Sequence, residues 1–349
     1  MARISRDALR GKVQTVLGPI APEQLGPTLM HEHLLLDLSS PVLASLGDPD
    51  DDIRLDNLYG LATGRVGSTR KYRMQERALM TEELARMVAA GGRSVVELTN
   101  GGLKPDPDGL AAIARATGAH IVMGCGWYVD EYQDHANENR TVEQITRDIV
   151  DQVLDGAWGT RVRAGMIGEI GCQWPWTNQE KKVMHAAVIA QQATGASINV
   201  HPGRHEDQPQ EAADFIVAHG GDIARVVISH IDRTIFDLDR LLRLADTGCT
   251  IEFDLFGTEY SYYALNPKID MPNDGTRLKL IRALIDRGHL GRVVISHDIC
   301  YLTRLVRYGG HGYGHIFANV VPMMRARDFS AAEIDAILID NPKRLLTFV

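Results

Sequence analysis

Six residues of metal-binding type each stand at the end of a short apolar run in this chain. They are His31, His33, Glu169, His201, His230 and Asp298. In a barrel of parallel strands the carboxyl ends of the strands converge on one face, where such enzymes keep their catalytic groups. Four imidazoles and two carboxylates gathered there would suit two divalent metal ions. The pattern therefore predicts a metal-dependent hydrolase.

The pair His31 and His33 is separated by a single residue, in the run TLMHEHL. In a strand this spacing places both side chains on one face, so both rings can bind one metal, while Glu32 points the other way. Such a pair on its own is a weak signal, because chance or a hydrogen-bonded pair in the core explains it equally well. Its place early in a barrel-like chain favours the metal.

His201 and His230 each end a run of β-branched residues, INVH and VVISH. A single buried histidine is usually a hydrogen-bonded core residue, and leaving one of its nitrogens unpaired costs about 1–3 kcal/mol. Two of them at equivalent strand ends, together with the first pair, are better explained as ligands.

The two carboxylates complete the set. Glu169 in MIGEIG would be a costly buried charge unless it is paired or bound to metal, and a carboxylate can bridge two cations. An ion pair with an Arg or Lys is the alternative. Asp298 in ISHDI is expected to ligate one metal and to accept the proton of the attacking water, whereas His297 should face outward. Oxygen and nitrogen ligands without thiolate suit Zn²⁺ first, and also Mn²⁺, Co²⁺, Fe²⁺ or Ni²⁺.

The elements that must position these residues are eight strand-like runs separated by helical patterns. The runs lie near residues 28–34, 94–99, 120–128, 164–171, 197–202, 225–231, 249–256 and 292–298. This alternation predicts right-handed βα units, and eight of them close most naturally into a single-domain (β/α)₈ barrel over residues 1–349. An open doubly wound sheet is the alternative, disfavoured because no GxGxxG turn follows a strand. Residues 40–76 and 300–328 are expected to form long loops at the active face.

Composition restricts the class further. The 349 residues carry a net charge of −8 with no cluster of Lys and Arg, which argues against a nucleic-acid partner. The first residues contain no apolar run of signal-peptide length, and no apolar stretch approaches membrane-spanning length. Four scattered cysteines fit neither a CxxC metal site nor a disulfide scaffold. We expect a cytoplasmic protein with reduced thiols and no contact with membranes.

Several long motifs resemble the phosphotriesterase family of the amidohydrolase superfamily, most closely its phosphotriesterase-related branch. They are GKVQTVLGPIAPEQLGPTLMHEHL, IGEIGCQWP, INVHPGR, ISHIDRTIFD, IEFDLFGTE, IDMPNDGTR, YGGHGYGHI and NPKRLLTF. The resemblance implies a (β/α)₈ barrel with a binuclear centre, in which the histidine pair, His201, His230 and Asp298 match family ligands. Many relatives bridge their metals with a carboxylated lysine, whereas this chain has Glu169, which puts direct transfer of organophosphate activity in doubt.

Substrate contacts are expected near the ligands. Tyr128, after the third strand, is placed to hydrogen-bond the developing oxyanion, with an ordinary barrel-mouth aromatic as the alternative. Arg204 and Arg233 follow ligand-bearing runs and could bind an anionic group; salt bridges to Asp232 or Glu206 are the alternative. The mouth could also include Lys104, Tyr260 and His311.

Three hydrolytic functions compete. The first is hydrolysis of a lactone or other carboxylic ester of an anionic small molecule. The second is hydrolysis of an amide such as an N-acyl amino acid or N-acyl sulfonate. The third is hydrolysis of a phosphotriester, as a promiscuous activity. A barrel that binds a ligand without catalysis is disfavoured, because a pure binder has no need of activated water. Relatives of this kind are often homodimers.

Overall fold

Eight short parallel strands occupy the middle of the molecule, in a computed structural model that describes residues 3–39, 52–133, 135 and 137–349. They form two sheets, one in the order β3-β6-β7 and one in the order β8-β9-β10-β11-β12. Their bounds are Thr28–Glu32 (β3), Ser94–Glu97 (β6), His120–Met123 (β7), Ile167–Gly171 (β8), Ile198–His201 (β9), Val226–Ile228 (β10), Thr250–Phe253 (β11) and Val293–Ile295 (β12). Every residue of these strands except His120 is buried, as expected for a parallel sheet covered on both faces. All eight predicted runs therefore contain a strand.

The two sheets approach each other at both of their edges. Beyond β12, the backbone N–H of Asp298 donates to the carbonyl of His31 in β3, at 3.1 Å. At the other edge, Gly168 N–H in β8 donates to the carbonyl of Cys125 beyond β7, at 2.7 Å. Within the described residues the strands therefore surround a common interior, although their ladders form two sheets rather than one continuous one.

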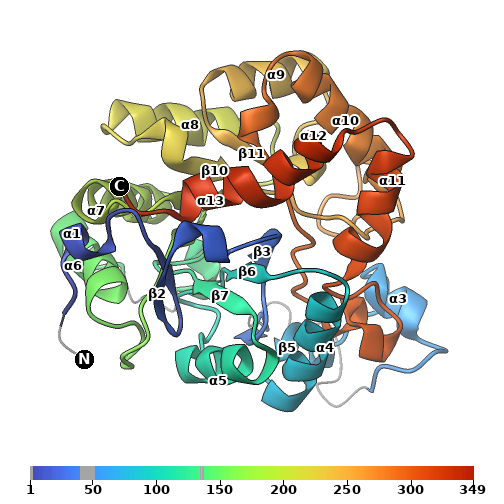
Figure 1. Cartoon of the computed structure of the whole chain (residues 1–349), viewed down its shortest axis with the longest axis horizontal. Helices are drawn as coiled ribbons and strands as arrows, with labels where there is room; N and C mark the ends of the chain where they lie inside the picture. The colour runs from blue at the N-terminus through green and yellow to red at the C-terminus, as the bar shows by residue number, and fades with distance from the viewer. Residues whose placement is uncertain (1–2, 40–51, 134, 136) are drawn as a thin grey trace.

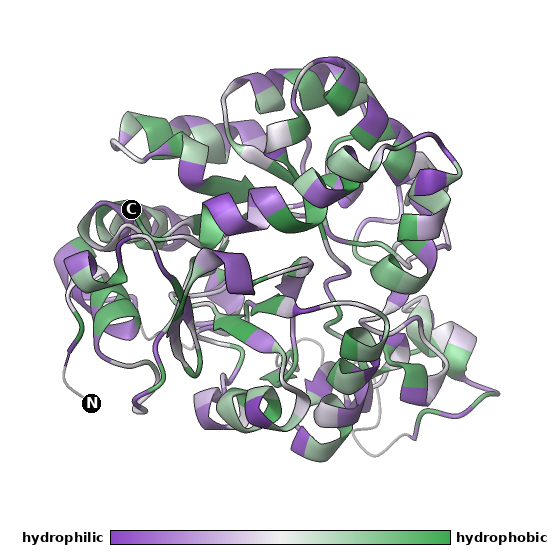
Figure 2. Ribbon diagram, in the orientation of Figure 1, coloured by the Kyte–Doolittle hydropathy of each residue, from purple (hydrophilic) through white to green (hydrophobic). Residues whose placement is uncertain are grey.

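Helices encircle these strands (Figure 1). They are α4 (Arg77–Ala89), α5 (Pro107–Thr117), α6 (Val142–Leu154), α7 (Asn178–Thr194), α8 (Gln208–Ala218), α9 (Leu238–Asp246) and α10 (Asp274–Asp286). Local signals set their ends: Thr141 and Thr177 make capping boxes at the starts of α6 and α7, and Gly195 ends α7 in the left-handed region at φ 77°. Hydrophobic and hydrophilic residues alternate along the outer helices, consistent with one face packed on the strands (Figure 2).

The C-terminal segment covers the amino ends of the strands. This segment contains α12 (Ala331–Asp335), a π-helical stretch (Ala336–Asp340) and α13 (Asn341–Leu346). The hydroxyl of Ser197, directly before β9, donates to the carbonyl of Leu345 in α13. Helix α1 (Arg6–Leu9) and the hairpin of β1 (Val13–Thr15) and β2 (Gly18–Ile20) come before β3. The opposite, carboxyl ends of the strands are thus left for the site.

The two predicted loops contain short elements. Residues 40–51 of the first loop lie outside the described residues; the rest includes α3 (Leu58–Ala62), a 3₁₀ turn (Arg70–Tyr72) and β5 (Arg73–Met74), which pairs with β4 (Leu36–Asp37). The second loop includes 3₁₀ turns at Leu302–Arg304 and Val306–Tyr308 and the short α11 (Val321–Arg325). Such short pieces leave no periodicity that a sequence pattern could reveal.

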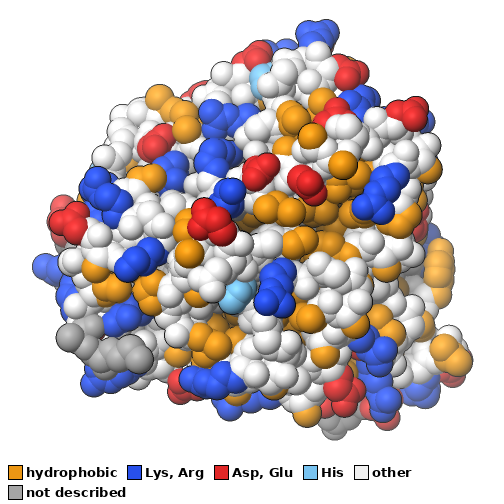
Figure 3. Space-filling model, in the orientation of Figure 1, with side chains coloured by type: hydrophobic (Ala, Val, Ile, Leu, Met, Phe, Trp, Pro, Cys, Tyr) orange, Lys and Arg blue, Asp and Glu red, His pale blue; other side chains and the backbone are white. Residues whose placement is uncertain are grey.

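Charged side chains lie on the surface (Figure 3) and the four cysteines lie in the core. Acidic and basic side chains are interspersed on the face in Figure 3. All four cysteines are free thiols, buried in the core. Among the described helices, none has the length and apolar character required to cross a membrane.

Candidate metal centre

The structure brings all six predicted ligands together at the carboxyl ends of the strands. His31 lies in β3 and His33 just beyond it, Glu169 lies in β8 and His201 ends β9. His230 and Asp298 follow β10 and β12, and both adopt the left-handed region, with φ of 56° and 50°. The side chain of Asp298 is 14% exposed, whereas the other five are almost fully buried.

The carboxylate of Glu169 lies among the four imidazoles. Its Oε2 atom is 2.7 Å from His201 Nδ1, 3.3 Å from His230 Nε2 and 3.4 Å from His31 Nε2. Its other oxygen, Oε1, is 3.4 Å from His33 Nε2. The two oxygens therefore face different histidines, which is the arrangement that a bridging carboxylate requires.

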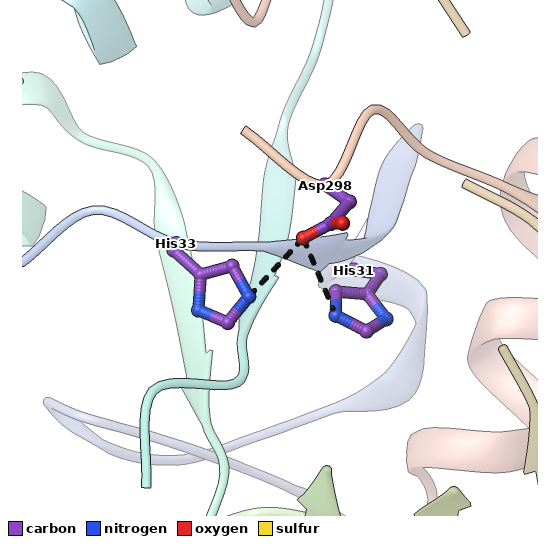
Figure 4. Close-up of side chains that lie close together, drawn as sticks. All are labelled: His31, His33 and Asp298. Carbon is purple, nitrogen blue, oxygen red and sulfur yellow. Dashed lines mark ion pairs between the residues drawn. The ribbon is translucent and has the colours of Figure 1, made fainter. Parts of the chain in front are cut away.

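Asp298 approaches the same histidines from the β12 side (Figure 4). Its Oδ1 atom is 3.3 Å from His33 Nε2 and 3.8 Å from His31 Nε2. The ligand atoms of His31, His33 and Asp298 all lie within 4.8 Å of one another, and so do those of His31, Glu169 and His230. Two overlapping sets of three ligands are thus present.

A further observation, independent of the spacing of the residues, indicates that this site suits divalent cations. The Nε2 atom of His31 is buried and has no hydrogen-bond partner among the described residues. A buried nitrogen without a hydrogen bond is costly, and a cation bound between the imidazoles and the nearby carboxylates would satisfy it. The donors are nitrogen and oxygen only, which suits Zn²⁺, Mn²⁺, Co²⁺, Fe²⁺ or Ni²⁺.

Carboxylates behind the ligands orient the histidine rings. Asp254 Oδ1 lies 2.9 Å from His230 Nδ1, and its Oδ2 accepts from the backbone N–H of His230 at 2.9 Å. His31 Nδ1 lies 3.2 Å from the hydroxyl of Ser229, which itself donates to Glu252 Oε2 at 2.8 Å. A proton on each Nδ1 leaves Nε2 free to bind metal, as is usual for ligating histidines.

The ring of His33 is oriented by a hydrogen-bonded relay through Thr99 to Glu97. His33 Nδ1 lies 3.0 Å from the hydroxyl of Thr99, which donates to Glu97 Oε1 at 2.6 Å. The sequence analysis did not identify this relay, nor Glu252 and Asp254. A signal for the last two was present, since IEFD places two carboxylates two positions apart in an apolar strand, and that spacing puts both on one face.

Asp254→Asn is expected to weaken metal affinity by about 10–100-fold, because the amide removes the charge that orients His230. Competition with a chelator measures the affinity. Asp214→Asn, at an exposed position on α8, is the matched control. Equal affinities in Asp254→Asn and the wild type would contradict the role assigned to Asp254.

The site holds protons in the absence of metal. Burial lowers the pKa of His33, but the carboxylates of Asp298 and Glu169 outweigh it and raise the pKa to about 9. For His201, burial is the dominant cause and lowers the pKa to about 3, despite the nearby Glu169. Burial raises the pKa of Glu169, but His201 and His31 more than offset this, so its pKa lies well below the usual value.

Metal binding at pH 7.5 is therefore expected to release protons, because ligation requires the neutral imidazole of His33. Since the raised pKa stabilises the metal-free fold, that contribution is fully present below pH 6.5 and is lost as pH rises through about 9. Calorimetric titration with Zn²⁺ in buffers of different ionisation enthalpy measures the release. Heats that do not depend on the buffer would contradict it.

Glu32 and His297 lie outside the ligand cluster, as expected, but they do not face solvent. Both are fully buried, and Glu32 Oε1 lies 2.7 Å from His297 Nδ1. Glu32 Oε2 also accepts from the backbone N–H of Ile299, at 3.0 Å. Glu32 therefore joins β3 to the turn that carries Asp298, and this tertiary contact replaces the outward position predicted for His297 from strand alternation.

Two of the predicted substrate contacts lie beside the ligands. The hydroxyl of Tyr128 is 3.4 Å from His201 Nε2, and burial together with Glu169 raises the pKa of this tyrosine, so it stays protonated and able to donate. Arg233 is 3% exposed, and its Nη2 atom lies 3.3 Å from His201 Nε2 and donates to the carbonyl of Pro202 at 3.1 Å.

The other four occupy positions with partners of their own. Arg204 is exposed and its Nε donates to the hydroxyl of Tyr263 at 2.8 Å. The remaining contacts are Lys104 Nζ to Asp37 Oδ2 at 2.6 Å, Tyr260 hydroxyl to the carbonyl of Ala62 at 2.8 Å, and His311 Nδ1 to the carbonyl of Gly312 at 3.2 Å. These roles stay predictions.

The ionic alternative for Arg204 and Arg233 is not observed. Asp232 pairs with Arg277 at 2.8 Å, and Glu206 pairs with Arg240 at 3.3 Å. Within the described part of the chain, neither Arg204 nor Arg233 has a carboxylate at ion-pair distance.

Comparison with known proteins identifies the family. The sequence profile of the phosphotriesterase family matches residues 11–346. The chain belongs to this family. It is 45% identical to an N-acetyltaurine hydrolase of Xenopus tropicalis over 346 residues, covering 98% of this chain and 99% of that protein.

Two solved structures are similar to this phosphotriesterase family member over nearly their whole length. A resiniferatoxin-binding protein from Rhodobacter sphaeroides is 30% identical with a TM-score of 0.91, over 99% of this chain and 98% of that chain. A phosphotriesterase homology protein from Escherichia coli, complexed with phosphate in its active site, is 29% identical with a TM-score of 0.75, over 93% and 99%. Family membership implies a TIM barrel and shows that the chain is a metal-dependent hydrolase.

Proposed function

We propose that this enzyme hydrolyses the amide bond of a small N-acylated aminosulfonate, with N-acetyltaurine as the type of substrate. The observation that carries the proposal is the 45% identity, over 98% of the chain, to an N-acetyltaurine hydrolase. This moves the amide ahead of the lactone or carboxylic ester that the sequence analysis placed first. Lactone and phosphotriester cleavage become secondary activities.

The centre would hold two divalent cations, with Zn²⁺ as the first candidate. His31, His33, Glu169 and Asp298 would surround one, and His201 and His230 would hold the other together with Glu169. Bound there, the cations would supply a nucleophilic water at neutral pH and a Lewis acid for the acyl carbonyl.

The chain's own side chains would handle the proton and the developing charge. Asp298 is the most accessible carboxylate of the cluster, and its low pKa keeps it ionised, because His33 and His230 outweigh the effect of burial. It would accept a proton from water and return it to the leaving amine, which is a poor leaving group unless protonated. The protonated hydroxyl of Tyr128 would donate to the carbonyl oxygen as it gains charge.

The charge around the centre supports an anionic substrate. Arg233 is a buried cation beside His201, and Arg204 lies exposed at the rim. Neither arginine has a carboxylate partner in the described residues. Positive charge that is not neutralised near the centre attracts a negatively charged substrate.

The deciding experiment compares kcat/KM of metal-loaded protein for N-acetyltaurine, N-acetyl-β-alanine, a γ-lactone and a phosphotriester. We expect the N-acyl sulfonate to be preferred by at least about tenfold, since one tenfold step corresponds to only about 1.4 kcal/mol of transition-state binding. A lactone that exceeds both amides would return the ester hypothesis to first place.

A further inference from the structure

Two cations that the sequence analysis did not single out share one aromatic ring close to the metal centre. Tyr301 lies three residues beyond Asp298, and the guanidinium carbon of Arg304 is 5.0 Å from the centre of its ring. Lys71, from the 3₁₀ turn far away in sequence, places Nζ 5.6 Å from the same ring centre and 4.9 Å from that of Tyr72. The rings of Tyr72 and Tyr301 meet edge to face at 5.3 Å. We call Lys71, Tyr72, Tyr301 and Arg304 the Tyr301 cluster.

Neither cation of the Tyr301 cluster is neutralised. In the described parts of the chain, no carboxylate lies within 4 Å of Lys71 or Arg304, and Lys71 is only 4% exposed, with its one hydrogen bond to the carbonyl of Leu61 at 2.8 Å. Burial and the charge of Arg304 lower the pKa of Lys71 to about 8. Buried charges are normally paired, so two unpaired cations side by side indicate a place for an anion.

Arg304 is held rigidly against the metal centre. Its Nη1 donates to the carbonyl of Asp298 at 2.6 Å and to that of His297 at 3.2 Å, while its Nε is buried and unpartnered. A guanidinium fixed in this way loses little entropy when it binds a ligand. Arg233, by contrast, contacts His201, so the two arginines reach the centre through different ligands.

We propose that the Tyr301 cluster is the subsite for the anionic head of the substrate, and that the head it takes is a sulfonate. The inference rests on the proposed function and extends it, because it places the aminosulfonate half on the Asp298 side and the acyl half towards Tyr128 and Arg233. A sulfonate has three acceptor oxygens and stays ionised, so it suits a guanidinium and an ammonium that lie against the same aromatic ring. Because Arg304 donates to the backbone carbonyl of Asp298, this placement puts the amine half on the side of the residue assigned to protonate it.

The test uses Arg304→Met and Lys71→Met, each assayed with N-acetyltaurine and with the uncharged N-propylacetamide. We expect KM for N-acetyltaurine to rise at least about tenfold with a smaller change in kcat, and kcat/KM to fall at least about tenfold more for N-acetyltaurine than for the uncharged amide. Arg304→Lys should recover part of the loss because it keeps the charge. Arg115→Met and Lys279→Met, at exposed positions of α5 and α10, are the matched controls. Equal losses on both substrates would show a purely structural role and overturn the proposal.

A binding measurement separates this inference from the proposed function. Ethanesulfonate is titrated calorimetrically into metal-loaded wild type and into both variants. Binding to the wild type that weakens at least about tenfold in the variants supports the subsite, even if the amide is not hydrolysed and the proposed function fails. Ethanesulfonate that binds all three proteins equally, or none of them, overturns the subsite, even if N-acetyltaurine is a good substrate.

Discussion

Asp298→Asn is expected to lower kcat for the preferred amide by about 10²–10⁴-fold, the usual contribution of a positioned general acid–base group. The asparagine keeps the shape of the side chain but cannot accept a proton from water and pass it to the amine. The backbone should tolerate the change, because Asp298 sits at φ 50° and asparagine adopts the left-handed region as readily as aspartate. Steady-state kinetics on metal-loaded protein measures the loss.

The chain offers a close control for this variant. Asp328 also has a positive φ, 61°, but lies exposed after α11, outside the candidate site. Asp328→Asn should therefore keep full activity and an unchanged melting temperature. Metal content must be measured in Asp298→Asn as well, because a variant that has lost metal would be inactive for another reason. Full turnover by metal-replete Asp298→Asn would refute the assignment of Asp298 as the proton-transfer residue.

Glu169→Gln is expected to have the second large effect. It should lower the metal content of the protein as well as its activity. Glu169 is the carboxylate that faces all four imidazoles, at distances from 2.7 to 3.4 Å. An amide offers one oxygen and no charge, so it cannot bridge two cations. Affinity should fall by more than the 10–100-fold that loss of an outer hydrogen-bond partner typically costs, and activity should fall with it. Elemental analysis after dialysis measures the stoichiometry.

Two comparisons make the result specific. Glu143→Gln, at an exposed position in the first turn of α6, should keep its full metal complement. Glu169→Asp retains the charge with a shorter side chain and should keep more metal than Glu169→Gln. If Glu169→Gln binds two equivalents as tightly as the wild type, Glu169 is not the bridge and the centre must be reassigned.

The sequence was enough to locate the six clustered residues because of where they stand. Each lies in or just after a short apolar run, and the carboxyl ends of parallel strands must meet on one face. Residue type together with position at the strand ends therefore indicated which residues share this edge. Their detailed orientation did not, since His230 and Asp298 lie past the last residues of β10 and β12, in a left-handed conformation that strand alternation does not anticipate.

The outer partners depended on tertiary structure. Asp254 reaches His230 from the neighbouring strand β11, and Glu32 reaches His297 across the junction between the two sheets. Local patterns describe which face of a strand a residue occupies, but which residue of another strand lies opposite depends on register and twist.

The chain's own order of residues indicated the eight βα units and the six clustered residues that could bind metal, because hydrophobic periodicity and residue type are local properties. The tertiary structure alone decided which Lys and Arg side chains lack a carboxylate partner among the described residues. It paired Asp232 with Arg277, left Arg233 without a carboxylate partner among the described residues, and brought Lys71 and Arg304 to the same ring from segments more than 200 residues apart. Charge pairing is a matter of distance in space, and at these separations the sequence does not specify it.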